Sequence, residues 1–266
     1  MGPSVAKFRP NAILTWGELS EAVLAVSGRI MVINHADRPV KMGVLNKWLV
    51  QSVGLKNSAN LMQKELQRIG LKPSKRVGTE VMARMAHFRI NHEHPNDIRE
   101  IAPNKPVTRA EAAYSFARIL TLTDWELDIL KNRARNFSLP ALGKWQKKFL
   151  KRAITTVGFP YIWGGASARA QAPFGKVVSG GFDCSGLTWY VYKFAPFKGA
   201  EKVARKMIGR TTYVMSGEFK RSQRITFNRL KPADLMFFGY SGTRSKPSEV
   251  GHVGIYLGGG WMIHSS

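Results

Sequence analysis

A single cysteine, Cys184, lies in surroundings that predict a reactive thiol. Asp183, directly before it, is a residue type that favours the N-cap of a helix. The residues beyond it have the i, i+3, i+4, i+7 apolar spacing of a helix packed on a core: Leu187, Tyr190, Val191 and Phe194. We therefore expect Cys184 in the first turn of a helix, where free backbone N–H groups and the helix dipole lower the pKa of a thiol. The alternative is a small buried cysteine without reactivity.

A β-hairpin is predicted near the end of the chain. Val250–Leu257 and Trp261–Ser266 are rich in residues that favour strands, and three glycines separate them. If all three glycines form the loop, Leu257 faces Trp261 across the hairpin. A loop of two residues would shift the register by one residue and turn the side chains of one strand to the opposite face.

The two histidines of this hairpin could serve the thiol. With a three-residue loop, Gly254 faces His264, and His252 lies on the same face one diagonal step away. Cys184, His252 and His264 then form a nucleophile, a base and a group that orients the base. We expect the Cys184 thiolate to attack a carbonyl, His252 to carry the proton to the leaving amine, and His264 to fix the tautomer of His252. This mechanism needs neither a metal nor an organic cofactor, and we expect none.

Several blocks in residues 145–266 resemble the NlpC family of cell-wall cysteine peptidases. They occur in the order that the family has: Tyr161–Gly165, Phe182–Leu187, Leu230–Phe238, Gly251–Leu257 and Met262–His264. The resemblance implies a papain-like α+β fold, in which the cysteine begins a helix that packs on an antiparallel sheet carrying the histidines. It also implies an endopeptidase that cleaves peptidoglycan stem peptides, typically between D-γ-glutamate and a diamino acid.

The same resemblance implies roles for three further residues. Tyr161 would line the oxyanion side of the site, and Asp183 and Ser185 would bind the free amino end of a stem peptide that has lost its sugar. Asp183 has a second interpretation as the N-cap alone, and it can fill both roles. Two other functions stay open: an amidase or acyltransferase with the same thiol chemistry, and a binding protein for wall polymers without catalysis.

The first half of the chain predicts a mostly helical, repeat-like domain, which we place at residues 1–138, with the peptidase domain at 139–266. Thr15–Glu18 and Thr108–Glu111 both have the Thr-x-x-Glu spacing of a capping box before a helical pattern. The segment Arg38–Lys41 is a candidate for a degenerate third copy. The run Val107–Ala113 resembles S-layer homology repeats, which hold exported proteins on wall polymers. The alternative is a plain helical domain with well-capped helices.

Charge is the strongest feature of the composition. The 266 residues carry a formal net charge of +24, which predicts attraction to a polyanion. The basic residues are spread over both halves and no base-stacking motif accompanies them, so we expect no nucleic acid. Anionic cell-wall polymers account for the charge, and the alternative is solubility alone. The chain has no apolar run long enough to span a membrane.

Two internal segments and the two ends of the chain carry further expectations. The connection 166–181 is rich in Ala, Gly, Ser and Pro; we expect a loop beside the cleft that narrows substrate choice or contacts glycan, and a tolerated surface insertion is the alternative. In Lys231–Asp234, alanine at the third turn position predicts a type I turn.

The chain ends two residues after His264, whereas relatives continue with further strands, so we expect a shortened peptidase domain. The first residues lack a secretory signal, and we expect an extracellular or wall-associated protein whose signal is not in this sequence.

Overall fold

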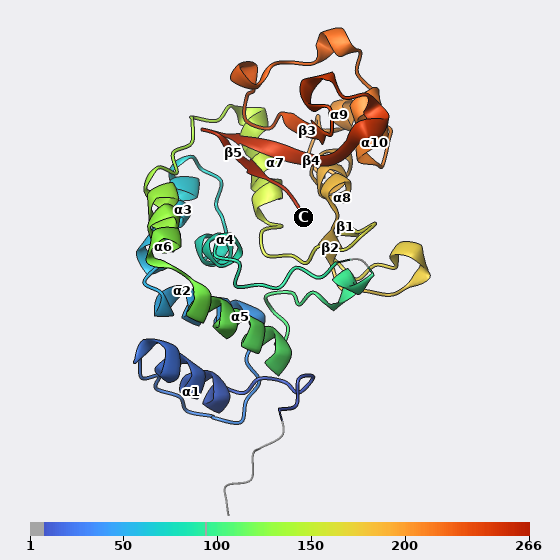
Figure 1. Ribbon diagram of the computed structural model, residues 1–266. Coiled ribbons are helices and arrows are strands. Elements are labelled where there is room, and N and C mark those ends of the chain that lie inside the picture. The colour runs from blue at the N-terminus through green and yellow to red at the C-terminus, as the bar shows by residue number, and fades with distance from the viewer. Residues whose placement is uncertain (1–7, 94) are drawn as a thin grey trace, which may run out of the picture. The chain divides into compact units, whose positions relative to one another are not determined.

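The computed structural model describes residues 8–93 and 95–266, and Figure 1 shows its helices and strands. The start of the chain, where no secretory signal was found, lies largely outside the described residues. The chain folds into two compact units. The first comprises residues up to Leu61, Gly78–Ile90 and Ile101–Asn136, and the second comprises Met62–Val77, Asn91–Glu100 and Phe137–Ser266. The second unit therefore takes two segments from the half of the chain that the sequence assigned to the helical domain.

The first unit is helical, as expected. Its helices are α1 (Trp16–Ser27), α2 (Met42–Ser52), α5 (Arg109–Thr121) and α6 (Asp124–Arg135), with most of α4 (Val77–Met85) and the start of α3 (Lys56–Arg68). The capping box predicted before α1 is present, because the Thr15 hydroxyl accepts from the Glu18 N–H and the Glu18 carboxylate accepts from the Thr15 N–H. The Thr108 hydroxyl likewise caps α5 by accepting from the Glu111 N–H. These caps explain why the helices begin where they do.

Three segments before α1, α2 and α5 hydrogen-bond to one another in a closed ring. Leu14 N–H donates to the Val107 carbonyl, Val107 N–H to the Val40 carbonyl and Val40 N–H to the Leu14 carbonyl, each at 2.9 Å. Two further sets of three hydrogen bonds, donated by residues 16, 42 and 109 and by residues 17, 43 and 110, also link the three segments, with one bond between each pair of segments. The segments therefore occupy equivalent places around an approximate threefold axis. The middle copy has this backbone geometry although its N-cap, Lys41, makes no side-chain cap.

The second unit has the expected α+β architecture. Its sheet is antiparallel in the order β3 (Leu235–Gly239), β4 (Val250–Gly258), β5 (Trp261–Ile263), and β1 (Ala166–Ser167) pairs with β2 (Gly181–Phe182). Its helices are α7 (Lys144–Ile154), α8 (Cys184–Thr188), α9 (Glu201–Lys206) and α10 (Thr212–Gly217), and α8 packs against β4. The core contains side chains that are fully buried or nearly so: Leu150, Ile162, Phe182, Val191, Val253 and Ile255. In neither unit does a described helix have the length and apolar character needed to cross a bilayer.

The β4–β5 hairpin differs from the prediction at its tip and agrees with it further along. Gly258 pairs with Trp261, so the turn has two residues, and the expected pairing of Leu257 with Trp261 is wrong. A bulge at Leu257 then restores the register, since Tyr256 pairs with Met262. One extra residue on β4 thus cancels the one-residue shift that a shorter loop causes. Beyond the bulge, each side chain of the hairpin therefore lies on the face of the sheet that a three-residue loop predicts.

The turn Lys231–Asp234 also differs from the prediction. Ala233 has φ +74°, which is the left-handed region, so the turn is of type II and the expected type I turn is wrong. The Asp234 N–H donates to the Lys231 carbonyl and closes the turn. Two tertiary contacts hold Ala233 in this conformation: its N–H donates to the Tyr256 carbonyl at 2.8 Å, and its carbonyl accepts from the Tyr192 hydroxyl at 2.6 Å.

Candidate active site

Cys184 is the first residue of helix α8, as the sequence predicts. Asp183 is the N-cap, and its carboxylate accepts from the Gly186 N–H at 2.5 Å. After five residues the α-helix passes into a turn of π-helix at Trp189–Lys193. Only half of the expected apolar stripe is buried. Leu187 and Val191 lie in the core, whereas Tyr190 and Phe194 are partly exposed. The cap fixes the position of the cysteine, and two buried side chains anchor the helix behind it.

His252 and His264 lie on one face of the hairpin and contact each other. The Nε2 atom of His252 is 3.0 Å from the Nδ1 atom of His264, and the two rings are nearly perpendicular. One of these nitrogens donates and the other accepts, as the tautomers decide. Because Nε2 of His252 is occupied by His264, Nδ1 is the nitrogen of His252 that remains for another partner. This is the relation expected between a base and the group that orients it.

Partial burial keeps both imidazoles neutral. Burial, and then the neighbouring His264, lower the pKa of His252 to about 4. Burial also lowers the pKa of His264. A neutral imidazole accepts a proton, so at neutral pH His252 is in the form that a general base requires.

The Cys184 thiol lies beside the strand that carries His252. The N–H group of Val253, the next residue on β4, favours the thiolate, as do the N–H groups of Ser185 and Cys184 itself. Burial and then the charge of Asp183 outweigh these donors, and the pKa of Cys184 is raised. The expectation of a lowered thiol pKa is therefore wrong for this structure. The residue that caps the helix is itself an anion next to the sulfur, and it opposes the helix dipole.

Tyr161 lies close enough to the thiol to respond to its charge. Burial, followed by the charges of Cys184, Asp183 and Asp97, raises the pKa of the Tyr161 phenol. The phenol therefore keeps its proton and can donate a hydrogen bond near the sulfur. A donor in this position suits the predicted place of Tyr161 on the oxyanion side.

Arg210 joins the head of helix α8 to the Gly164–Gly165 backbone. Its guanidinium donates to both carboxylate oxygens of Asp183 at 3.1 Å and to the Ser185 hydroxyl at 2.6 Å. It also donates to the carbonyls of Gly164 and Gly165. The Gly164 N–H and the Ser185 hydroxyl donate to Asp183 as well. The contacts made by Asp183 and Ser185 in this structure are thus internal.

A comparison with protein-family models identifies the C-terminal part of the chain. The model of the NlpC/P60 family matches residues 158–266. This part of the chain is an NlpC/P60 domain. The match covers the cysteine helix, the histidine hairpin and Arg210, so the blocks that resembled the family are confirmed as its domain. No solved structure matches the chain.

Curated relatives of the NlpC/P60 domain are named as peptidases. Murein DD-endopeptidase MepH of Escherichia coli (strain K12) is 33% identical over 119 residues, which are 45% of this chain and 35% of the relative. Gamma-D-glutamyl-L-lysine dipeptidyl-peptidase of Bacillus subtilis (strain 168) is 30% identical over 109 residues, 41% of this chain and 28% of the relative. Peptidoglycan endopeptidase RipA of Mycobacterium tuberculosis (strain ATCC 25618 / H37Rv) is 28% identical over 120 residues, 44% of this chain and 21% of the relative. The matched segment thus spans about a third or less of each relative.

Two carboxylates outside the NlpC/P60 match hold its Tyr161–Trp163 segment in place. Glu100 accepts from the Tyr161 N–H at 2.5 Å, and Asp97 accepts from the Trp163 N–H at 2.5 Å. Both carboxylates are buried, and they lie on a segment that belongs to the second unit. Sequence reasoning missed them, because two acids in a polar loop carry no spacing signal. Among the residues that the structure describes, no group of three or more His, Cys, Asp or Glu could hold a metal ion.

Proposed function

We propose that this protein is a cysteine endopeptidase that hydrolyses peptidoglycan stem peptides between D-γ-glutamate and a diamino acid. The observation that carries the proposal is the hydrogen bond of His264 to His252, which lies on the strand next to Cys184 within an NlpC/P60 domain. The names of the relatives support a peptidoglycan substrate, because they include a murein DD-endopeptidase, and one of them, a γ-D-glutamyl-L-lysine peptidase, supports the bond.

The proposed reaction begins with a neutral thiol and a neutral imidazole. Nδ1 of His252 takes the proton of Cys184 as the sulfur attacks the scissile carbonyl, so the raised thiol pKa is overcome by transfer to an adjacent base. Backbone N–H groups at the start of α8 and the Tyr161 hydroxyl stabilise the oxyanion. The C–N bond then breaks, and the amine of the diamino acid leaves with the proton from His252. Water, deprotonated by His252, hydrolyses the thioester and regenerates the thiol.

His264 is proposed to act through His252. Its hydrogen bond to Nε2 keeps the His252 ring oriented and stabilises the imidazolium that forms during the reaction. The binding of a free amino end by Asp183 and Ser185 stays a prediction from the family resemblance. Their hydrogen bonds to Arg210 would then have to make room for the substrate amine.

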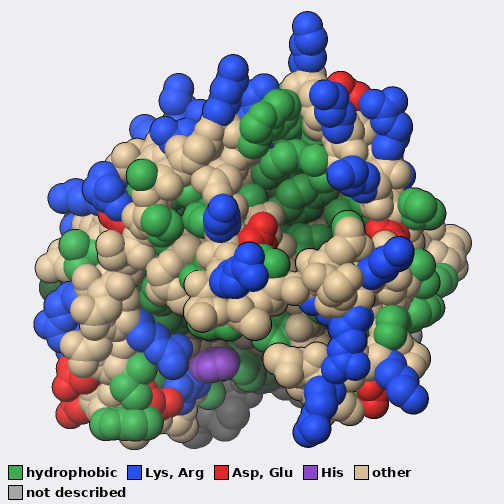
Figure 2. Space-filling model, turned by 90° about the horizontal axis from the view of Figure 1, so that it is seen from above, with side chains coloured by type: hydrophobic (Ala, Val, Ile, Leu, Met, Phe, Trp, Pro, Cys, Tyr) green, Lys and Arg blue, Asp and Glu red, His purple; other side chains and the backbone are tan. Residues whose placement is uncertain are grey.

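The partners are proposed to include anionic wall polymers, and the place of action is proposed to be the cell wall or the extracellular space. The net charge of +24 supports this, and Figure 2 shows Lys and Arg side chains distributed over one face with few Asp and Glu among them. The first unit, with its three equivalent segments, is the proposed wall-binding region. Binding of the protein to isolated wall fragments should weaken as salt rises, and salt-independent binding would count against an electrostatic partner.

Digestion of purified muropeptides tests the proposed activity. The wild-type protein and a Cys184→Ala variant are incubated with muropeptides, and the products are identified by mass spectrometry. We expect the wild type to open the D-γ-glutamyl bond with addition of one water, and the variant to leave the substrate intact. Transfer or release of acyl groups from other substrates would favour an amidase or acyltransferase. Identical behaviour of the two proteins would favour a binding protein without catalysis.

A further inference from the structure

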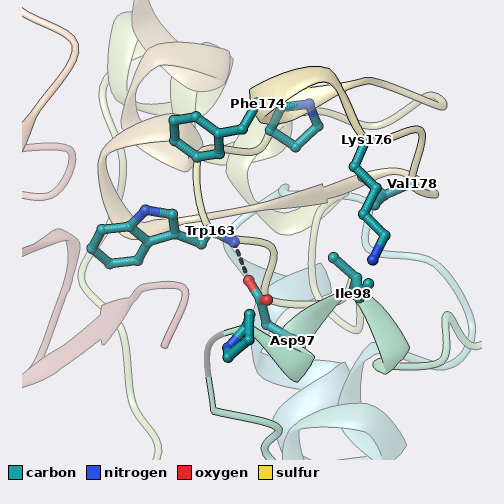
Figure 3. A pocket seen from close by; sticks show the side chains of 8 residues that line it. Asp97, Ile98, Trp163, Phe174, Lys176 and Val178 are labelled. Carbon is teal, nitrogen blue, oxygen red and sulfur yellow. Dashed lines mark hydrogen bonds between the residues drawn. The ribbon is translucent and has the colours of Figure 1, made fainter.

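A pocket beside the cysteine helix has the character of a carbohydrate subsite. Its volume is about 190 Å³, and aromatic, proline and aliphatic side chains line it together with one lysine and one carboxylate: Trp163, Phe174, Pro95, Pro173, Ile98, Val178, Lys176 and Asp97. Figure 3 shows Trp163 and Phe174 together on one side and Lys176, Val178 and Ile98 on the other. Mostly apolar walls with a few polar groups are typical of ligand sites.

We infer that this pocket binds one sugar residue of the glycan strand, so that the enzyme acts on stem peptides still attached to glycan. The inference rests on the proposed function, since it names the form of the substrate that the same active site accepts. Pockets for drug-sized ligands measure roughly 300–1,000 Å³, so this smaller one suits a single ring rather than a chain of sugars.

Phe174 is held in position for a ligand rather than for the core. Its side chain is 80% exposed, and its backbone lies in the left-handed region at φ 55°, which is uncommon for a bulky residue. Its ring lies against the backbone of Gly164, where a β-carbon would come within 2.7 Å of the ring. An exposed aromatic ring kept in a strained conformation is a feature of binding sites.

Trp163 connects the pocket to the reaction centre. The residue is 51% exposed, and its backbone N–H donates to Asp97, which also lines the pocket. The next N–H along the chain, that of Gly164, donates to Asp183, the residue before Cys184. A ligand on Trp163 therefore lies near the head of helix α8, because Gly164 follows Trp163 and bonds the N-cap Asp183.

The chemistry of the walls matches a pyranose ring. Such a ring has an apolar face of C–H groups, which packs on the aromatic rings of Trp163 and Phe174, and a polar edge of oxygens, which Lys176 can meet. This substrate takes the place of the peptide with a free amino end that the family resemblance implies, because such an amino end is less well served in this structure. Asp183, its expected partner, already accepts five hydrogen bonds, from the Gly164 and Gly186 N–H groups, the Ser185 hydroxyl and two nitrogens of Arg210.

A pair of substrates tests the inference: a disaccharide stem peptide and the same peptide without sugar. The readout is the ratio of the two kcat/KM values for the wild type and three variants. Phe174→Asn removes the ring and keeps a residue that tolerates φ > 0. Phe174→Tyr keeps the ring. Val177→Asn is the matched control, because Val177 is 78% exposed on the same loop and does not line the pocket.

We expect the wild type to prefer the disaccharide peptide and Phe174→Asn to lower that preference about five- to tenfold. Phe174→Tyr and Val177→Asn should keep it. An unchanged ratio in Phe174→Asn, an equal fall on both substrates, or a wild-type preference for the sugar-free peptide would overturn the inference. If the wild type cleaves neither substrate, the proposed function fails. Calorimetry with the uncleaved disaccharide peptide then tests separately whether the pocket binds sugar. Binding weakened five- to tenfold by Phe174→Asn supports the pocket, and equal binding refutes it.

Discussion

Replacing Arg210 with methionine should loosen the head of the catalytic helix and make the thiol less acidic. The guanidinium makes five hydrogen bonds, three to Asp183 and Ser185 and two to the carbonyls of Gly164 and Gly165. Methionine fills a similar volume and makes none of them. Asp183 would then keep its charge in a largely buried place with only N–H and hydroxyl partners.

The expected loss of stability lies between two limits. Breaking a buried ion pair by removing one partner costs about 3–5 kcal/mol, whereas an exposed pair contributes about 0–1 kcal/mol. The side chains of Arg210 and Asp183 are 29% and 12% exposed, so the pair is nearer to the buried limit. We expect Arg210→Met to lower the free energy of unfolding by about 2–3 kcal/mol. Since the charge of Asp183 already raises the pKa of Cys184, loss of the compensating arginine should raise that pKa further.

Urea unfolding and thiol alkylation measure the two effects. Cys184 is the only cysteine, so the rate of alkylation against pH reports its ionisation alone. Arg169→Met is the matched control, because Arg169 is exposed on the 166–181 loop. The double variant Arg210→Met, Asp183→Asn should recover part of both losses, since the uncompensated charge is gone. A destabilisation below about 0.5 kcal/mol, or an unchanged thiol pKa, would refute the reasoning.

Three further predictions concern the sheet and His252. Ala233→Gly should raise the free energy of unfolding by about 0.5–1 kcal/mol in urea titrations. Glycine avoids the left-handed strain of about 1–2 kcal/mol, and the greater chain entropy of unfolded glycine cancels part of that gain. The control Ala195→Gly, at a position without positive φ, should only lower the free energy of unfolding. Gly258→Ala should lower the free energy of unfolding by about 3 kcal/mol in the same assay, because φ is +103° and the new β-carbon would meet the Pro140 ring. A loss below about 1 kcal/mol would contradict this and show that the hairpin tip adapts. The free energy of unfolding should fall as pH drops from about 6.5 to about 4, because over this range His252 binds a proton in the unfolded chain but not in the folded one, where its pKa is about 4. His252→Asn should make this dependence on pH less steep. An equally steep dependence in the variant would contradict the assignment.

Local rules predicted the parts of the site that lie close together in sequence. The Asp183 cap and the position of Cys184 follow from residue types within one helical turn. The common face of His252 and His264 was predicted from a loop that is one residue too long. The face is nevertheless as predicted, because the bulge at Leu257 cancels the error, and alternation alone does not reveal a bulge.

Tertiary context decided what sequence reasoning could not predict. The thiol pKa depends on burial and on the charge of Asp183, which a favourable helix end does not outweigh. Ala233 adopts a left-handed conformation because contacts with Tyr192 and Tyr256 hold it there. Asp97 comes from a distant part of the sequence to hold the Trp163 backbone, and no spacing rule links such separate segments.

The acyl-enzyme is the most direct test of the proposed chemistry. The protein is mixed briefly with a muropeptide, quenched in acid and measured as an intact chain by mass spectrometry, with Cys184→Ala alongside. A thioester pathway predicts a mass increase equal to the fragment that ends in D-γ-glutamate less one water, located on Cys184 and absent from the variant. Turnover without an adduct on Cys184, or turnover that survives in Cys184→Ala, would contradict it.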